Sequence, residues 1–158
     1  MPCNRRRASG LVLLVLLVAG CDQDDQQRTF ADDARRVPAG FTETDNGGRV
    51  LSTDADDWRT APLFAGRVAL DPAFPNPSTA PGSSLTVSLL TFGAVSGGVQ
   101  LRGIDASGNS VLLATLRETD PGTFLGPFNP LGLGAGLRRV FLFDAGGQLI
   151  SYGDVHVP

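Results

Sequence analysis

The residues best suited to chemistry are three carboxylates that fall within four positions of the chain. Asp54, Asp56 and Asp57 belong to the segment Thr-Asp-Ala-Asp-Asp-Trp-Arg, which ends at Arg59. Hard cations such as Ca²⁺ take about six to eight oxygen ligands, and alternate aspartates are a common source of them. The segment lacks the glycine and the distal glutamate of an EF-hand loop, so we favour a solvated acidic turn over a Ca²⁺ site.

A second candidate is His156, the one histidine of the sequence. On a strand it would share a face with Asp154 and Tyr152, because side chains two positions apart point the same way. An aspartate can orient a histidine as a general base. No nucleophile motif accompanies this pair, which lies close to the last residue. We therefore favour a surface histidine, and a hydrolase is the least supported function.

The first residues of the chain indicate export. Arg5, Arg6 and Arg7 precede an apolar run from Leu11 to Val18, which as a helix covers about half of the ~30 Å bilayer core and is typical of a signal peptide. Val18-Ala19-Gly20-Cys21 resembles the lipobox of bacterial lipoproteins. The resemblance implies that Cys21 is lipidated on sulfur, released from Gly20 and acylated at its new amino group. The alternative is an ordinary thiol beside a conventional cleavage site.

The net charge of the chain and the lipids expected on Cys21 indicate which partners to expect. Loss of residues 1–20 would remove three arginines and no acid, so the formal charge would change from −3 to −6. This balance disfavours nucleic acid and anionic lipid headgroups as partners. Stable anchoring takes about two acyl chains, which a lipidated Cys21 would exceed. We expect a bacterial cell-envelope protein held by its lipid anchor to the outer or inner membrane.

Two segments separate this anchor from the main domain. Residues 22–38 are polar and charged with almost no core residues, which predicts a flexible tether. Residues 41–52 hold two short β-like runs around Asp45-Asn46-Gly47-Gly48, which predicts either a hairpin or an ordered loop. We divide the chain into a signal peptide at 1–20, the lipidated cysteine with its tether at 21–57, and a β domain at 58–158.

The β domain is predicted from the positions of glycine and proline. Glycine and proline, 20 and 11 of 158 residues, fall between short apolar runs, as in all-β proteins. Leu85, Val87 and Leu89 alternate with polar residues and should share one face of a strand. No stretch has a sustained helical period. We expect strands at residues 84–90, 99–105, 110–118, 123–128, 138–144 and 148–157.

Two turns suggest how these strands pair. Asp105 to Asn109 and Asp144 to Gln148 share the pattern Asp-Ala-x-Gly-amide, in which the aspartate binds backbone amides and the glycine takes a left-handed conformation. Two such hairpins, separated by a connection, fit the C–C′ and F–G pairs of an immunoglobulin-like domain, which has roughly 100 residues. The sequence therefore predicts an all-β, immunoglobulin- or fibronectin III-like sandwich of about seven strands.

The segment Pro75-Asn76-Pro77, the alternating strand after it and the Asp-x-x-Gly hairpin carry a family resemblance. Together they resemble the immunoglobulin-like modules of bacterial surface proteins, including type IX secretion sorting domains and the flagellar hook-capping proteins. The resemblance covers the chain from about Val68 to its end and implies the same fold. Pro72, Pro75 and Pro77 cannot donate ladder hydrogen bonds, so we expect them in an edge segment.

The last two predicted strands are apolar on both faces, although a sandwich needs one inward face per sheet. Their second face is either covered by residues 61–69, with Leu63 and Phe64, or exposed as an interaction patch. We favour coverage, because large exposed patches are unusual in monomers. The candidate patch consists of Phe141, Phe143, Ile150 and Tyr152.

The sequence thus favours a membrane-anchored envelope lipoprotein that acts as a binding or scaffolding module without catalysis. An envelope protein or a glycan would be its partner, and no cofactor is expected apart from the Ca²⁺ considered above. The alternative is a calcium- or carbohydrate-binding surface module that uses the acidic segment and Trp58. We favour Trp58 packing into the sandwich, or capping one end of it, over stacking on a ligand.

Overall fold

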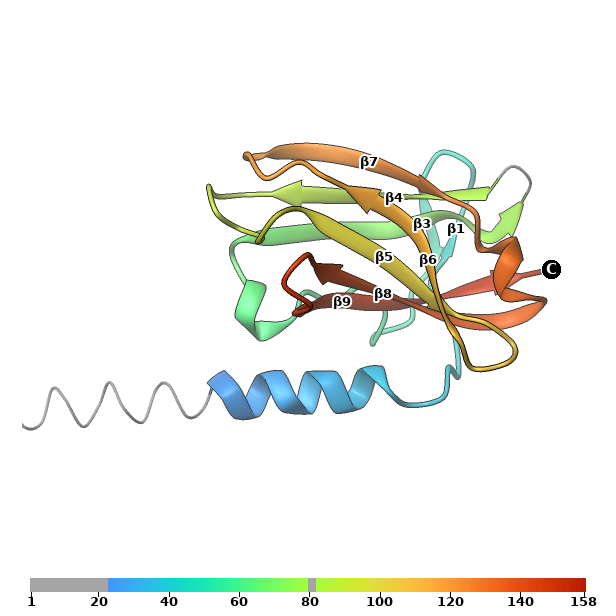
Figure 1. Cartoon of the computed structure of the whole chain (residues 1–158). Helices are drawn as coiled ribbons and strands as arrows, with labels where there is room; N and C mark the ends of the chain where they lie inside the picture. Colours follow the sequence, from blue (N-terminus) through green and yellow to red (C-terminus); the bar gives the residue numbers. More distant parts are fainter. Residues whose placement is uncertain (1–22, 80–81) are drawn as a thin grey trace, which may run out of the picture.

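Two antiparallel sheets face each other in the structure, a computed structural model that describes residues 23–79 and 82–158 (Figure 1). One sheet has the strand order β2-β1-β3-β4-β7 and the other has the order β6-β5-β8-β9. The strands are β1 (Glu43–Thr44), β2 (Val50–Ser52), β3 (Val68–Thr79), β4 (Gly82–Leu89), β5 (Val99–Ile104), β6 (Ser110–Leu116), β7 (Gly122–Phe128), β8 (Gly136–Asp144) and β9 (Leu149–Val157). Two 3₁₀ helices lie in the connections between strands: η1 (Pro62–Phe64) before β3 and η2 (Pro130–Leu133) before β8. The predicted all-β sandwich is confirmed.

The core forms where the two sheets meet. In β4 every second side chain is buried, and Leu85, Val87 and Leu89 are each at most 3% exposed, as their alternation predicts. Val99 and Leu101 of β5 alternate in the same way on the opposite sheet. Burying one such aliphatic side chain contributes about 1.5–3 kcal/mol, so these two strands supply a large share of the stability.

Both predicted hairpins are present. β5 pairs with β6 through the turn at Asp105, and β8 pairs with β9 through the turn at Asp144. If β3 to β9 are lettered A, B, C, C′, E, F and G, the sheets contain A-B-E and C′-C-F-G, which is the fibronectin III-like arrangement of such sandwiches. The short β1–β2 hairpin extends the first sheet beyond β3.

Residues 41–52 use the same turn as these two hairpins, so the hairpin is the correct alternative for this segment. In all three turns the carboxylate of the first aspartate accepts the N–H of the fifth residue at 2.8–2.9 Å. The fourth residue is in each case a glycine with positive φ, namely Gly48 (82°), Gly108 (83°) and Gly147 (84°). A side chain at that angle would be strained, which explains the glycine.

The proline-rich segment lies within β3, which is not an edge strand throughout. β3 pairs with β4, and β1 pairs with it at Thr44 and Asn76. Its register with β4 shifts between Asp71 and Phe74 and again between Phe74 and Thr79. The prolines therefore stand where the ladder is irregular, which suits residues without an N–H.

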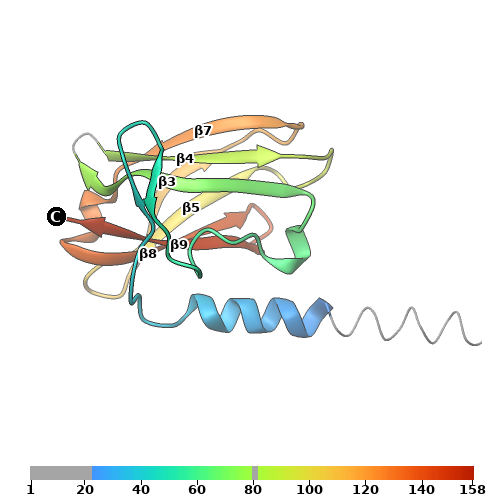
Figure 2. The ribbon, with the colours of Figure 1, turned by 180° about the vertical axis from the view of Figure 1, so that it is seen from behind.

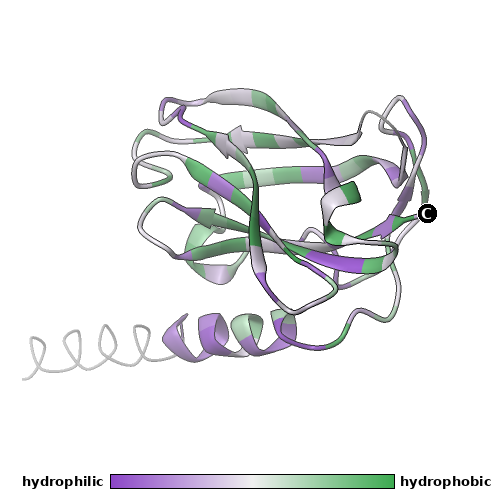
Figure 3. Ribbon diagram, turned by 45° about the vertical axis from the view of Figure 1, so that its right-hand side comes forward, coloured by the Kyte–Doolittle hydropathy of each residue, from purple (hydrophilic) through white to green (hydrophobic). Residues whose placement is uncertain are grey.

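The predicted flexible tether is wrong for most of its length, because residues 23–34 form a helix (Figure 1). Phe30 and Ala34, four positions apart, are 6% and 1% exposed. Most of the helix ribbon is coloured as hydrophilic (Figure 3), and aspartates and arginines in and just after the helix pair three positions apart. Across the described ranges, no helix is both long and apolar enough to span a membrane. The signal peptide and Cys21 lie outside the described residues.

Candidate functional site

The helix at residues 23–34 lies along the outer face of the sheet that contains β8 and β9, as two opposite views show (Figures 1 and 2). The Phe30 ring lies 5.1 Å from the ring of Tyr152. The side chain of Gln27 donates to the carbonyl of Leu149 at 3.2 Å and accepts the N–H of Leu63 at 3.1 Å. The helix is therefore fixed to the sheet by specific polar bonds as well as by apolar contact.

The centre of this contact is the guanidinium of Arg139 on β8, a side chain only 5% exposed. Its Nε and Nη2 donate to the two carboxylate oxygens of Asp154 at 2.7 and 2.6 Å. Its Nη1 donates to the carbonyls of Asp33, Ala34 and Arg36 at 3.2, 3.3 and 2.8 Å. A cation at the C-terminal end of a helix satisfies the last carbonyls and complements the helix dipole.

Further contacts hold this guanidinium in place. It lies 4.8 Å from the centre of the Tyr152 ring, within the range of a cation–π interaction. Asp56 is 3.6 Å away and adds a second, half-exposed carboxylate. Burial by itself lowers the pKa of Arg139, but the bonds to Asp154 more than offset this effect and raise the pKa. Arg139 therefore stays charged while it joins helix and sheet.

The helix changes the interpretation of the apolar patch. Ile150 and Tyr152 are fully buried, so they cannot belong to an exposed surface. Phe141 and Phe143 stack with ring centres 6.1 Å apart and are half-buried beside a groove of about 320 Å³ between the helix and the β8–β9 hairpin. The chain itself covers most of this face, and Phe64 of η1 is among the buried core residues. The exposed patch proposed for these four residues is therefore not present.

One carboxylate of the acidic segment is used inside the protein. Asp57 is 8% exposed, and its carboxylate accepts the N–H groups of Thr42 at 2.7 Å and Asp154 at 2.8 Å. Asp54 accepts the N–H of Asp56, and the two side chains also interact with each other, which raises the pKa of Asp56. In the part of the chain that the structure describes, no three potential ligand residues are grouped to hold a metal ion.

Asp57 also belongs to a group of residues that closes the outer edge of β9. The amide of Asn76, fully buried, donates to the carbonyls of Thr42 and Asp154 at 2.9 Å and accepts the N–H of His156 at 2.9 Å. The backbone N–H of Trp58 donates to the backbone carbonyl of Tyr152 at 2.7 Å. These bonds replace a neighbouring strand, since buried or edge backbone groups need partners.

Two other candidates have structural roles. Trp58 is 6% exposed and packs on Gly153, where an added Cβ would overlap its ring; the expectation that it packs against the domain is confirmed. His156 is half-buried and stacks on Phe41 with ring centres 5.4 Å apart. Both oxygens of Asp154 are bonded to Arg139, so this carboxylate does not orient the histidine.

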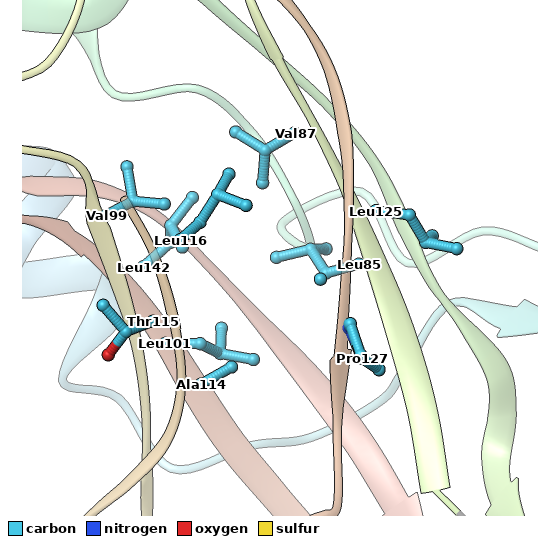
Figure 4. A pocket seen from close by; sticks show the side chains of 11 residues that line it. Leu85, Val87, Val99, Leu101, Ala114, Thr115, Leu116, Leu125, Pro127 and Leu142 are labelled. Carbon is cyan, nitrogen blue, oxygen red and sulfur yellow. The ribbon is translucent and has the colours of Figure 1, made fainter. Parts of the chain in front are cut away.

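A cleft that the sequence analysis missed opens between the sheets beside β6 and β7, the last strands of their sheets. Its volume is about 240 Å³, and side chains from both sheets point into it (Figure 4). The lining is aliphatic apart from Thr115 and includes the following residues: Leu85, Val87, Val99, Leu101, Ala114, Leu116, Leu125 and Leu142. Alternation predicts which residues face inward, but not whether the sheets close over them.

The edges of the cleft are unusual. Neither β6 nor β7 contains a charged residue, and Leu112 and Leu125 on these strands are 52% and 58% exposed. Natural edge strands commonly carry charged residues or proline, which discourage pairing with another chain. Of these, β7 contains only a proline, Pro127. Uncharged edge strands are the kind of element to which an extended peptide can add.

Comparisons with known protein families, with curated proteins and with solved structures found no match to this chain.

Replacing Arg139 should destabilise the protein strongly. Arg139→Ala leaves Asp154 buried without a partner and removes the helix cap, so we expect a loss of about 3–5 kcal/mol in the free energy of unfolding. Arg35→Ala is the matched control, because the Arg35–Asp32 pair at the end of the same helix is exposed and its loss should cost under about 1 kcal/mol. Urea unfolding of the two variants measures this difference. Equal losses would contradict the role given to Arg139.

Asp57 should make stability depend on pH. Burial, together with the neighbouring Asp154 and Asp54, raises its pKa to about 7 despite its two backbone N–H bonds, whereas its pKa in the unfolded chain is about 3.9. Between these values the folded state binds a proton that the unfolded state lacks. The free energy of unfolding should therefore rise as the pH falls from about 8 to about 5, and fall as the pH rises.

The measurement is urea unfolding at several pH values, followed by the fluorescence of Trp58, the one tryptophan. Asp57→Asn cannot titrate and should give a flatter profile over the same range. If the wild-type protein and this variant show the same slope, the proton uptake does not belong to Asp57.

Proposed function

We propose that the protein is a lipid-anchored module of the bacterial cell envelope that binds a partner through the cleft beside β6 and β7. The sequence Val18-Ala19-Gly20-Cys21 supports the anchor. The cleft, lined by aliphatic side chains and bordered by two uncharged strands, is the observation that supports binding. The role is one of recognition or scaffolding, not of catalysis.

The position of the helix defines how the anchor would hold the domain. Its first described residue, Gln23, comes two positions after Cys21. Because Arg139 and Gln27 bind the helix to the sheet, the lipid would be attached to the domain without a long flexible spacer. The domain would work close to the membrane surface, and not at a tether's length from it.

The chemistry of the cleft indicates the kind of partner. An extended segment can add to a free sheet edge through main-chain hydrogen bonds, and its alternate side chains can then enter adjacent pockets. Leu125 of β7, which is exposed and borders the cleft, would contact such a segment. We therefore propose an extended, apolar segment of another envelope protein as the ligand.

The acidic segment gives less support to the alternative of a calcium- or carbohydrate-binding surface. Asp57 is turned inward to the edge of β9, and Trp58 packs against Gly153. Asp54 and Asp56 would remain as the two accessible carboxylates of the segment, which is few for a cation that takes about six to eight oxygen ligands.

A charge placed on β7 should abolish binding at the cleft. Leu125→Asp puts a carboxylate at its rim, whereas Leu51→Asp places the same charge on β2, at a leucine that is 55% exposed, close to the 58% of Leu125. The test is capture of partners from native envelopes by the full lipidated protein and these two variants. We expect Leu125→Asp to lose a partner that the other two retain. Equal capture by all three proteins would exclude the cleft as the binding site.

A further inference from the structure

The loop between β4 and β5 exposes apolar side chains at one end of the sandwich. Phe92 is 81% exposed and Leu90 is 51% exposed. Within residues 23–79 and 82–158, Phe92 is the one aromatic among the large hydrophobic side chains that are exposed. The loop is also held at its base, because Arg67 donates to the carbonyl of Gly93 at 2.6 Å. A fixed loop that presents a phenyl ring to the outside needs an explanation.

The first described residues of the helix lie at this same end. The β8–β9 turn contacts the β4–β5 loop, because the N–H of Ala145 donates to the carbonyls of Ser96 and Gly98 at 3.1 and 3.0 Å. Gln148, in the same turn, lines a pocket together with Gln23 and Asp24 of the helix. Figures 1 and 2 show the start of the helix and the β4–β5 loop at the same end of the molecule.

The length of chain before the helix links this end to the anchor. Gln23 follows Cys21 by two positions, and two positions of a fully extended chain span at most about 7 Å. If Cys21 carries lipid, the end of the domain that bears Gln23 must lie at the membrane surface. The β4–β5 loop would face the same surface.

The absence of charge on the loop itself suits this position. Residues 72–101 contain no charged residue, so insertion of the loop tip would bury no ion. Arg67 lies at its base, where a cation can meet lipid phosphates. The neighbouring β6–β7 connection carries Arg117, Glu118 and Asp120, which would remain in the hydrated headgroup layer. Aromatic side chains are favoured at the membrane–water interface.

We propose that this end of the sandwich is a second membrane contact, in which Phe92 and Leu90 enter the interfacial region of the bilayer beside the anchored Cys21. The inference rests on the proposed lipidation. The two contacts together would fix the orientation of the domain. The long axes of the strands would extend away from the membrane, with the β1–β2 hairpin at the far end (Figure 1).

The test uses the full lipidated protein in vesicles of phosphatidylethanolamine and phosphatidylglycerol. Cys3 lies in the signal peptide and the sulfur of Cys21 would be blocked, so an introduced cysteine can be labelled alone. Thr91→Cys places a polarity-sensitive fluorophore beside Phe92, and Ser52→Cys places it on β2 as the control; both positions are exposed. Nitroxide lipids then report the proximity of each label to the bilayer.

We expect several-fold stronger quenching, with a blue-shifted emission, at position 91 than at position 52. Adding Phe92→Ser to the Thr91→Cys variant should reduce this quenching. Equal quenching at the two positions, quenching that is unchanged by Phe92→Ser, or a blue shift without lipid quenching would each overturn the proposal, the last by indicating a protein contact.

Flotation of the same samples with the vesicles separates this proposal from the one on which it rests. Protein that floats but shows no quenching at position 91 retains the anchor and lacks the second contact. Protein that does not float lacks the anchor, and both proposals then fail.

Discussion

The buried guanidinium of Arg139 is the interaction on which the arrangement of the chain depends. A buried cation is costly unless it is paired and its N–H groups are bonded. One side of this guanidinium meets Asp154 within the sheet, and the other side meets the last carbonyls of the helix. An isolated helix of about a dozen residues is marginal in water. The helix therefore depends on Arg139 for its stability, and Arg139 depends on the helix carbonyls as hydrogen-bond acceptors.

The outer edge of β9 also depends on contacts with distant parts of the chain. Asp57, Trp58 and Asn76 form hydrogen bonds to the backbone of this edge, and they come from segments far from β9 in the sequence. The expected division into a tether up to residue 57 and a domain from residue 58 therefore has no counterpart in the contacts. Gln27, Phe30 and the carbonyl of Ala34 contact the sandwich directly, so the helix and the β domain form one structure.

The sandwich could be predicted because its signals are local. Alternation identified the inward face of β4, and the aspartate and glycine spacing identified two hairpins; the same spacing at Asp45 and Gly48 identifies a third. The helix was missed because its apolar stripe is thin and its composition resembles a solvated spacer. The regular spacing of Asp25 and Arg28, repeated at Asp32 and Arg35, is the helical signal that was available.

The site was less predictable because it depends on register. Arg139 and Asp154 look like surface charges in the sequence, and only the pairing of β8 with β9 places them side by side. Likewise Asn76 stands between two prolines, and no local pattern indicates that its amide reaches β9. The cleft depends on the distance between two sheets at their last strands, which no single strand encodes.

If Arg139 joins the helix to the sheet, the helix is part of the folded domain, and amide hydrogen exchange tests this most directly. In the native full-length protein, the amides of residues 27–34 should be protected to an extent close to that of β8 and β9, because they open only when the Arg139 contacts break. Exchange of the helix at the rate of an isolated peptide, with the sheet still protected, would show that the helix is free and would contradict the account.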